Sequence, residues 1–252
     1  SWNSVDESIM YLKFLDVSSY FLLISSLIVA AVGIFYWNRL EKFLQVFTVL
    51  KIASFLCDGS SKVLLVFAGV NPNHISIFYG LAQLLLLFWF YYLIFEKPSL
   101  KKPFLIVGIG LTLLGIGNWI FSEGQSNALY TNAIDTAALL GLCVYYFYKM
   151  LKTESEVNIL SAPLFWINTG LLIYLSGTLL LFLSADYIIR VLKDDFALFL
   201  TIHNFLGVIA NGLFFYGIWL GVKPSKNKII IDWHQYPTTE HEHDDCKFYI
   251  IL

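Results

Sequence analysis

The sequence predicts an all-α membrane protein, a seven-transmembrane-helix bundle with its N-terminus outside and its C-terminus in the cytoplasm. Its composition, its long apolar runs and the uneven distribution of Lys and Arg among its loops support this prediction. Hydrophobic residues make up 58% of the 252 residues and charged residues 13%, whereas soluble domains contain about 25% charged residues. With a mean hydropathy of +0.70, the composition is typical of a protein embedded in the lipid bilayer.

Each apolar run is long enough to cross the bilayer as a helix, which needs about 20 predominantly apolar residues. A helix also satisfies its backbone hydrogen bonds within one segment, as a spanning element must. The seven runs cover residues 18–37, 43–70, 75–95, 104–121, 128–148, 160–185 and 196–222. We therefore expect an extracytoplasmic segment at 1–17, a seven-helix domain at 18–222 and a cytoplasmic, His-rich tail at 223–252.

Alternate loops differ sharply in their content of Lys and Arg, and cytoplasmic loops usually carry the excess. One set of loops contains Arg39, Lys42, Lys97, Lys101, Lys102, Lys149, Lys152, Lys223, Lys226 and Lys228. The other set contains only Lys13, Arg190 and Lys193. The first set is therefore expected to face the cytoplasm. The net charge of -2 is close to balanced and gives no reason to expect a nucleic-acid partner.

Asp58 and Lys62 stand one helical turn apart inside the apolar run 43–70. An ionisable side chain at bilayer depth costs at least about 2.5–3.5 kcal/mol, so it usually marks a pathway, a pocket or a partner. Two interpretations stay open: a structural ion pair at i, i+4, or a functional site. Lys51 and Ser54 share this face of the helix, but Lys51 is nearer the cytoplasmic side and is expected to snorkel toward it.

Other polar residues fall in the outer halves of their predicted helices, at a depth similar to that of Asp58 and Lys62. They are Gln83, Asn118, Asn132, Asp135, His203 and Asn204, and Tyr174 is among the aromatic residues that could line a shared cavity. The sequence thus predicts an outward-facing polar cavity that binds a small ligand. The alternative is that the amides and the histidine form hydrogen bonds between helices.

The tail contains His234, His241 and His243, which are ligand types for zinc, although their spacing matches no standard site. Two short apolar segments at 229–233 and 248–252 predict strands that could dock on a cytoplasmic or membrane partner protein. The run 196–222 lacks a lysine, so a retinal Schiff base in the usual position is not expected. No other cofactor is predicted.

The segment from Phe165 to Gly177, FWINTGLLIYLSG, resembles a motif of seven-helix membrane modules of Bacteroidota. The segments YYFYK at 145–149 and IHN at 202–204 are also similar to that group. The resemblance covers about residues 18–222. In that group such modules can precede histidine-kinase domains, which implies a sensory input role and a bacterial cytoplasmic membrane location.

We therefore expect a receptor-like protein that binds a small ligand and signals to a separate partner, rather than an enzyme. An intramembrane lipid hydrolase with Asp58 or His203 as the base is an alternative. A structural subunit of a larger membrane complex and a proton-coupled carrier are two further alternatives, although an odd number of helices without an internal repeat argues against the carrier.

Overall fold

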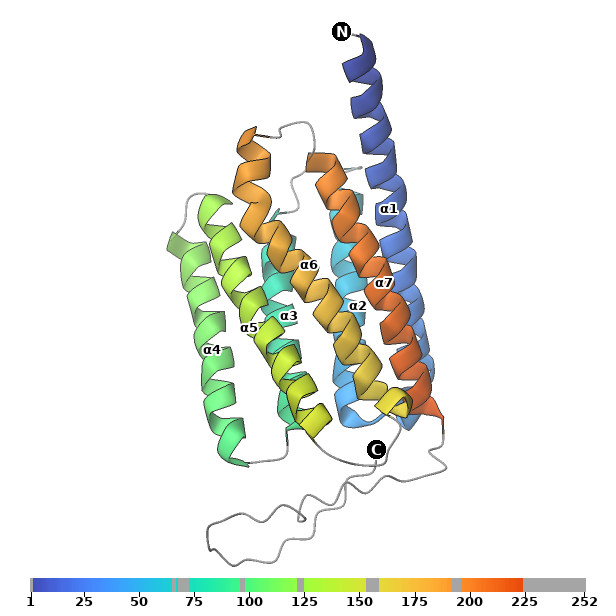
Figure 1. Cartoon of the computed structure of the whole chain (residues 1–252), viewed down its shortest axis with the longest axis vertical. Helices are drawn as coiled ribbons and strands as arrows, with labels where there is room; N and C mark the ends of the chain where they lie inside the picture. Colours follow the sequence, from blue (N-terminus) through green and yellow to red (C-terminus); the bar gives the residue numbers. More distant parts are fainter. Residues whose placement is uncertain are drawn as a thin grey trace, which may run out of the picture.

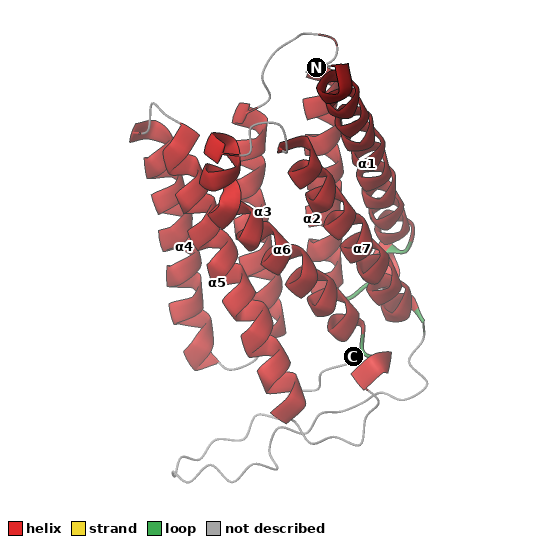
Figure 2. Ribbon diagram, turned by 45° about the horizontal axis from the view of Figure 1, so that its top comes forward, coloured by secondary structure: helices red, strands yellow, loops and turns green. Residues whose placement is uncertain are grey.

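The computed structural model describes residues 2–64, 67, 73–95, 98–121, 125–152, 159–191 and 196–223, and this part of the chain is helical and contains no strand (Figure 1; Figure 2). The α-helices are α1 (Trp2–Phe35), α2 (Lys42–Val63), α3 (Asn73–Ile94), α4 (Pro98–Phe121), α5 (Gln125–Lys152), α6 (Pro163–Val191) and α7 (Phe196–Val222), with short 3-10 helices η1 (Trp37–Arg39) and η3 (Ile159–Ser161). The predicted all-α class is confirmed for these residues.

Five of the helices contain segments that are long and apolar enough to cross a membrane. These segments are Lys13–Phe35, Lys42–Val63, Asn132–Lys152, Pro163–Ser184 and Ala197–Val222. Shorter apolar stretches lie in α3, at Phe78–Ile94, and in α4, at Phe104–Asn118. Many large apolar side chains also face outward, for example Phe35 and Ile106, as expected for a surface covered by lipid. The chain is thus an integral, multi-pass membrane protein.

Residues 2–17 of the predicted N-terminal segment are helical and continue directly into the first predicted span. Helix α1 begins at Trp2, and its first turns extend past the ends of the other helices (Figure 1). Residues 2–17 contain no Gly or Pro that would interrupt a helix, which accounts for this continuity. The predicted tail strands at 229–233 and 248–252 lie outside the described residues.

The helices follow one another around the bundle, so that α7 packs against both α6 and α1. Helices α1, α3, α5 and α7 finish, and α2, α4 and α6 start, at one end of the bundle (Figure 1), and most Lys and Arg residues of the described ranges lie at or next to these helix termini. We call this the basic end; its described residues are Arg39, Lys42, Lys101, Lys102, Lys149, Lys152 and Lys223. The end where α2 finishes and α7 starts is called the opposite end.

A cluster of buried aromatic and aliphatic side chains, including Phe47, Phe90 and Phe214, lies toward the basic end. The Phe47 ring packs edge-on against Phe214, with ring centroids 4.9 Å apart, and tilted against Phe90 at 5.5 Å. Nearby, α6 and α7 approach so closely that a Cβ on Gly217 would lie 3.0 Å from the Pro163 carbonyl oxygen. Small residues permit such close contact between membrane helices. This contact fixes α6 and α7 beside the cavity described next.

Candidate functional site

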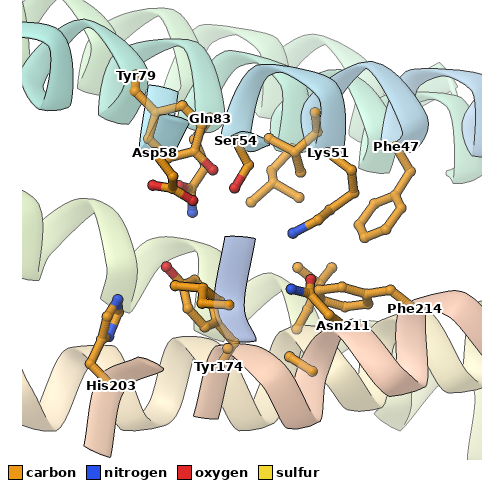
Figure 3. A pocket seen from close by; sticks show the side chains of 16 residues that line it. Phe47, Lys51, Ser54, Asp58, Tyr79, Gln83, Tyr174, His203, Asn211 and Phe214 are labelled. Atoms are coloured by element: carbon orange, nitrogen blue, oxygen red, sulfur yellow. The ribbon is translucent and has the colours of Figure 1, made fainter. Parts of the chain in front are cut away.

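A cavity of about 80 Å³ lies inside the bundle between α2, α3, α6 and α7, with Leu22 of α1 also at its wall (Figure 3). Most of its lining is apolar, but its polar residues come from all four helices. They are Lys51, Ser54 and Asp58 of α2, Tyr79 and Gln83 of α3, Tyr174 of α6, and His203 and Asn211 of α7. A cavity needs about 10–15 Å³ of such volume for each water molecule, so this one can hold several waters or one small polar molecule.

Lys51 is the most unusual residue of the cavity, because its side chain is only 8% exposed. Its ammonium group points into the space between α2 and α7 and lies 5.4 Å from the centroid of the Phe214 ring (Figure 3). No hydrogen bond or ion pair to Lys51 is present within the described part of the chain. The expectation that Lys51 snorkels to the membrane surface is therefore wrong, because its side chain turns into the bundle.

Asp58 also faces the cavity, but it does not form the ion pair with Lys62 that was one of the two interpretations left open by the sequence. The Lys62 ammonium instead lies 3.4 Å from the centroid of the Tyr20 ring on α1. In the described ranges no ion pair joins Asp58 to either lysine. Lys51 and Asp58 are seven residues apart, so their Cα atoms are separated by about 10.5 Å along the α2 axis. The cavity thus contains two opposite charges that do not contact each other.

The other polar side chains near Asp58 each contain an oxygen or nitrogen atom that can accept a hydrogen bond. Figure 3 shows Tyr79 and Gln83 beside Asp58, and Tyr174 and His203 on the facing wall. The rings of Tyr174 and His203 lie with centroids 5.4 Å apart. His203 Nδ1 is buried and has no hydrogen-bond partner among the described residues. Since a buried polar atom normally has a partner, this nitrogen is free to bind a water or a ligand.

Asn118 and Asp135 do not reach this cavity, because they line a second hollow between α4 and α5 of about 430 Å³. Its rim consists of exposed apolar side chains, including Leu113, Leu114 and Ile134. Asp135 Oδ1 is buried there without a hydrogen-bond partner in the described part of the chain. Asn132, one turn earlier on α5, has an exposed side chain. The polar residues of α4 and α5 are therefore separate from those of α2.

Asn204 connects two helices instead of lining the cavity. Its Nδ2 donates a hydrogen bond of 3.0 Å to Ser18 Oγ of α1, and Asn211 Nδ2, two turns further, donates one of 2.8 Å to Ser25 Oγ. Each serine hydroxyl donates in turn to a carbonyl of its own helix, Ser18 to Leu15 and Ser25 to Leu22. For Asn204 the structure therefore supports the alternative interpretation, a hydrogen bond between helices.

The structure thus divides the nine residues predicted to bind a ligand. Asp58, Gln83, Tyr174 and His203 line the central cavity; Asn118 and Asp135 line the second hollow; and Lys62, Asn132 and Asn204 lie elsewhere. His234, His241 and His243 fall outside the described residues. Within the described ranges no group of three or more His, Cys, Asp or Glu residues is placed to hold a metal ion.

Sequence reasoning missed Lys51 and Asn211 as cavity residues, although a signal for each was present. Lys51, Ser54 and Asp58 are spaced by three and four residues, which places them on one helix face. Ser18 and Ser25, like Asn204 and Asn211, are seven residues apart, the spacing of two helical turns. Matching these two seven-residue patterns would have paired α1 with α7.

Sequence reasoning also missed a polar network near the basic end. Tyr91 Oη donates a hydrogen bond to Asn168 Oδ1, and Asn168 Nδ2 donates one of 3.0 Å to the Cys143 carbonyl oxygen. Cys143 Sγ lies 3.0 Å from Tyr91 Oη. Since the tyrosine proton is used toward Asn168, the thiol is the donor in this contact. All three residues are buried, and the network joins α3, α5 and α6.

Comparison of the chain with family models, with curated proteins and with solved structures finds no match.

Proposed function

We propose that this chain is a receptor-like membrane protein that binds a small polar ligand in the central cavity and signals to a separate partner protein. The observation that carries the proposal is the pair of opposite charges, the buried Lys51 and the half-buried Asp58, which face one cavity without forming an ion pair. Buried charges are normally paired or bound to something, and ionisable residues at membrane depth usually serve a function. Asp58 has Ser54 as a hydrogen-bonding neighbour, and a ligand would supply the oppositely charged contacts that both groups lack.

The proposal includes seven spanning helices with the basic end in the cytoplasm of a bacterial cell. The gathering of Arg39, Lys42 and other basic residues at one end supports this orientation. The dense packing around Phe47 and Phe214 lies between the cavity and the basic end. The proposal therefore has the ligand enter from the opposite end, which would then be outside.

The cavity also suggests how binding is transmitted. Its walls belong to α2, α3, α6 and α7, with Leu22 of α1, so a ligand that contacts several of these helices favours one packing of them over another. Lys62, which contacts Tyr20 of α1, has no part in this mechanism. The change in packing would reach a partner through the cytoplasmic loops or the tail.

A lipid hydrolase agrees less well with the central cavity. Its substrate would bring an acyl chain, whereas about 80 Å³ is far below the roughly 300–1,000 Å³ of pockets that bury larger ligands. Asp58 and His203 do lie in the same cavity, but they face a space suited to a much smaller molecule.

The experiment is to purify the full chain gently, reconstitute it in nanodiscs and identify by mass spectrometry the small molecules released on heating. We expect the wild-type protein to release a molecule that is absent from Lys51→Met and Asp58→Asn. Lys62→Met and Asp16→Asn are matched controls, since Lys62 contacts α1 and Asp16 is exposed. The same released molecules from the wild type and both cavity variants would contradict the proposal.

The hollow between α4 and α5 favours a second candidate function, a subunit of a larger membrane complex. The half-buried Asp135, whose Oδ1 has no hydrogen-bond partner among the described residues, lies among exposed leucine and isoleucine side chains and suits a polar group on another transmembrane helix. Native mass spectrometry tests this directly. We expect Asp135→Leu to release the chain from a larger complex, and a wild-type chain that is monomeric in every detergent contradicts it.

A further inference from the structure

From the charges of the central cavity we infer that its ligand is a small zwitterion of the amino-acid type, with its carboxylate at Lys51 and its ammonium at Asp58. This inference rests on the proposed function, because it names the class of ligand for the same site. It depends on three features of the cavity: its balance of charge, the arrangement of its donors and acceptors, and its size.

The first feature is the balance of charge. Among the residues that line the cavity, Lys51 and Asp58 carry formal charges. These two charges are opposite and cancel. A ligand with only a negative charge would leave one uncompensated negative charge in a region of low dielectric constant, and a ligand with only a positive charge would leave one positive charge. Both are costly away from water. A zwitterion leaves the net charge at zero and gives Lys51 and Asp58 each an oppositely charged partner.

The second feature is the separation of donors from acceptors along α2. The Lys51 ammonium carries three N–H donors and no acceptor, and it has no hydrogen bond or ion pair within the described ranges. A carboxylate is therefore its natural partner. Two turns further, Asp58 lies with Gln83 and Tyr79 (Figure 3), whose oxygen atoms can accept the three protons of an ammonium group. The Lys51 end of the cavity thus suits a carboxylate, and the Asp58 end suits an ammonium group, which are the two charged groups of an amino acid.

The third feature is size. A volume of about 80 Å³ holds only a few atoms beyond those of the two charged groups. Apolar side chains such as Leu87, Leu171 and Ala210 complete the lining and can pack against a short carbon chain. Glycine, β-alanine and 4-aminobutyrate are therefore suitable probes, because they present the same two charged groups on chains of increasing length.

The test is equilibrium dialysis of the full chain in nanodiscs against each of these three molecules in radiolabelled form. Acetate, propionate and propylamine serve as comparison ligands that carry one charged group each. We expect at least one zwitterion to bind and the comparison ligands to bind much more weakly. Lys51→Met and Asp58→Asn should each weaken its binding about 30-fold or more, since each variant leaves a charged group of the ligand buried without its partner.

Two sets of variants separate lost binding from lost folding. Lys51→Arg and Asp58→Glu keep the charges and should lose less affinity than the neutral variants. Lys62→Met and Asp16→Asn change charges outside the cavity and should bind as the wild type does. Every variant is compared only after it elutes as a monodisperse species in size-exclusion chromatography.

Several outcomes would overturn the inference. Binding of acetate or propylamine as tight as that of the best zwitterion would do so, as would a loss of binding in only one of the two neutral variants. If none of the three zwitterions binds, but a different molecule is released from the wild type and not from Lys51→Met and Asp58→Asn, the inference fails and the proposed function stands. If no molecule distinguishes the wild type from these variants, both fail.

Discussion

Near the basic end, the buried side chains of Tyr91, Cys143 and Asn168 bond to one another, whereas further into the bundle Lys51 and Asp58 face a cavity without forming an ion pair. A satisfied polar network strengthens a core and defines its packing. A buried charge without an oppositely charged contact, such as Lys51, weakens the empty protein. The difference indicates that the first group serves the fold and that the second is present for another reason, which we assign to ligand binding.

The largest expected effect is on the network near the basic end. Asn168→Ala removes both the acceptor for Tyr91 Oη and the donor to the Cys143 carbonyl oxygen, and it leaves a small void in a tightly packed region. We expect the free energy of unfolding to fall by about 3–5 kcal/mol, the sum of unsatisfied buried groups and a cavity. Titration with SDS in mixed micelles would measure the change.

Asn132→Ala is the matched control, because the Asn132 side chain is exposed on α5, and we expect its effect to stay within about 0.5 kcal/mol. A loss at Asn168 no larger than that at Asn132 would mean that the network contributes nothing to stability. The contrast between the two halves of the bundle would then disappear.

The opposite sign is expected in the cavity. The double variant Lys51→Met, Asp58→Leu replaces both buried charges with apolar side chains of similar size, and such replacements are often neutral or stabilising by about 1–4 kcal/mol. We expect this variant to be at least as stable as the ligand-free wild type in the same SDS titration, while it loses ligand binding. A destabilisation of more than about 2 kcal/mol would place Lys51 and Asp58 with the structural network instead.

The same contrast explains what could be predicted from the sequence. The helical class and the grouping of basic residues follow from hydropathy and charge, which act along each segment separately. Asp58 and His203 were recognised because ionisable or polar residues are rare in such runs. These inferences needed no knowledge of which helices are neighbours.

Packing between helices could not be predicted in this way. Lys51 and Lys62 lie on the same helix and differ only in the direction that each side chain takes, one toward Phe214 and the other toward Tyr20. Depth alone also grouped Asp135 with Asp58, although α5 places Asp135 in a different hollow. Distances across the bundle depend on tertiary contacts, which a depth argument does not contain.

A smaller effect is expected between α1 and α7. Asn204→Ala removes the hydrogen bond to Ser18 Oγ, and hydrogen bonds between membrane helices contribute about 0.6 kcal/mol on average and up to about 1.7 kcal/mol. A double-mutant cycle with Ser18→Ala should therefore give a coupling energy in this range, with ligand binding unchanged. A loss of ligand binding in Asn204→Ala would show that Asn204 contributes to the ligand site after all.

The smallest expected effect is that of Lys62→Met. The Lys62 ammonium lies over the Tyr20 ring at 3.4 Å, and a cation–π contact that is partly exposed contributes about 0.5–1 kcal/mol. Because the lysine stem and the methionine side chain cover a similar apolar area, little else is lost. We therefore expect a decrease of at most about 1 kcal/mol in the SDS titration and no change in binding. Lys62 and Lys51 lie on the same helix and differ in the direction of their side chains. A loss of binding in Lys51→Met but not in Lys62→Met would therefore reflect that direction. Equal effects of the two variants would show that the cavity gives Lys51 no special role.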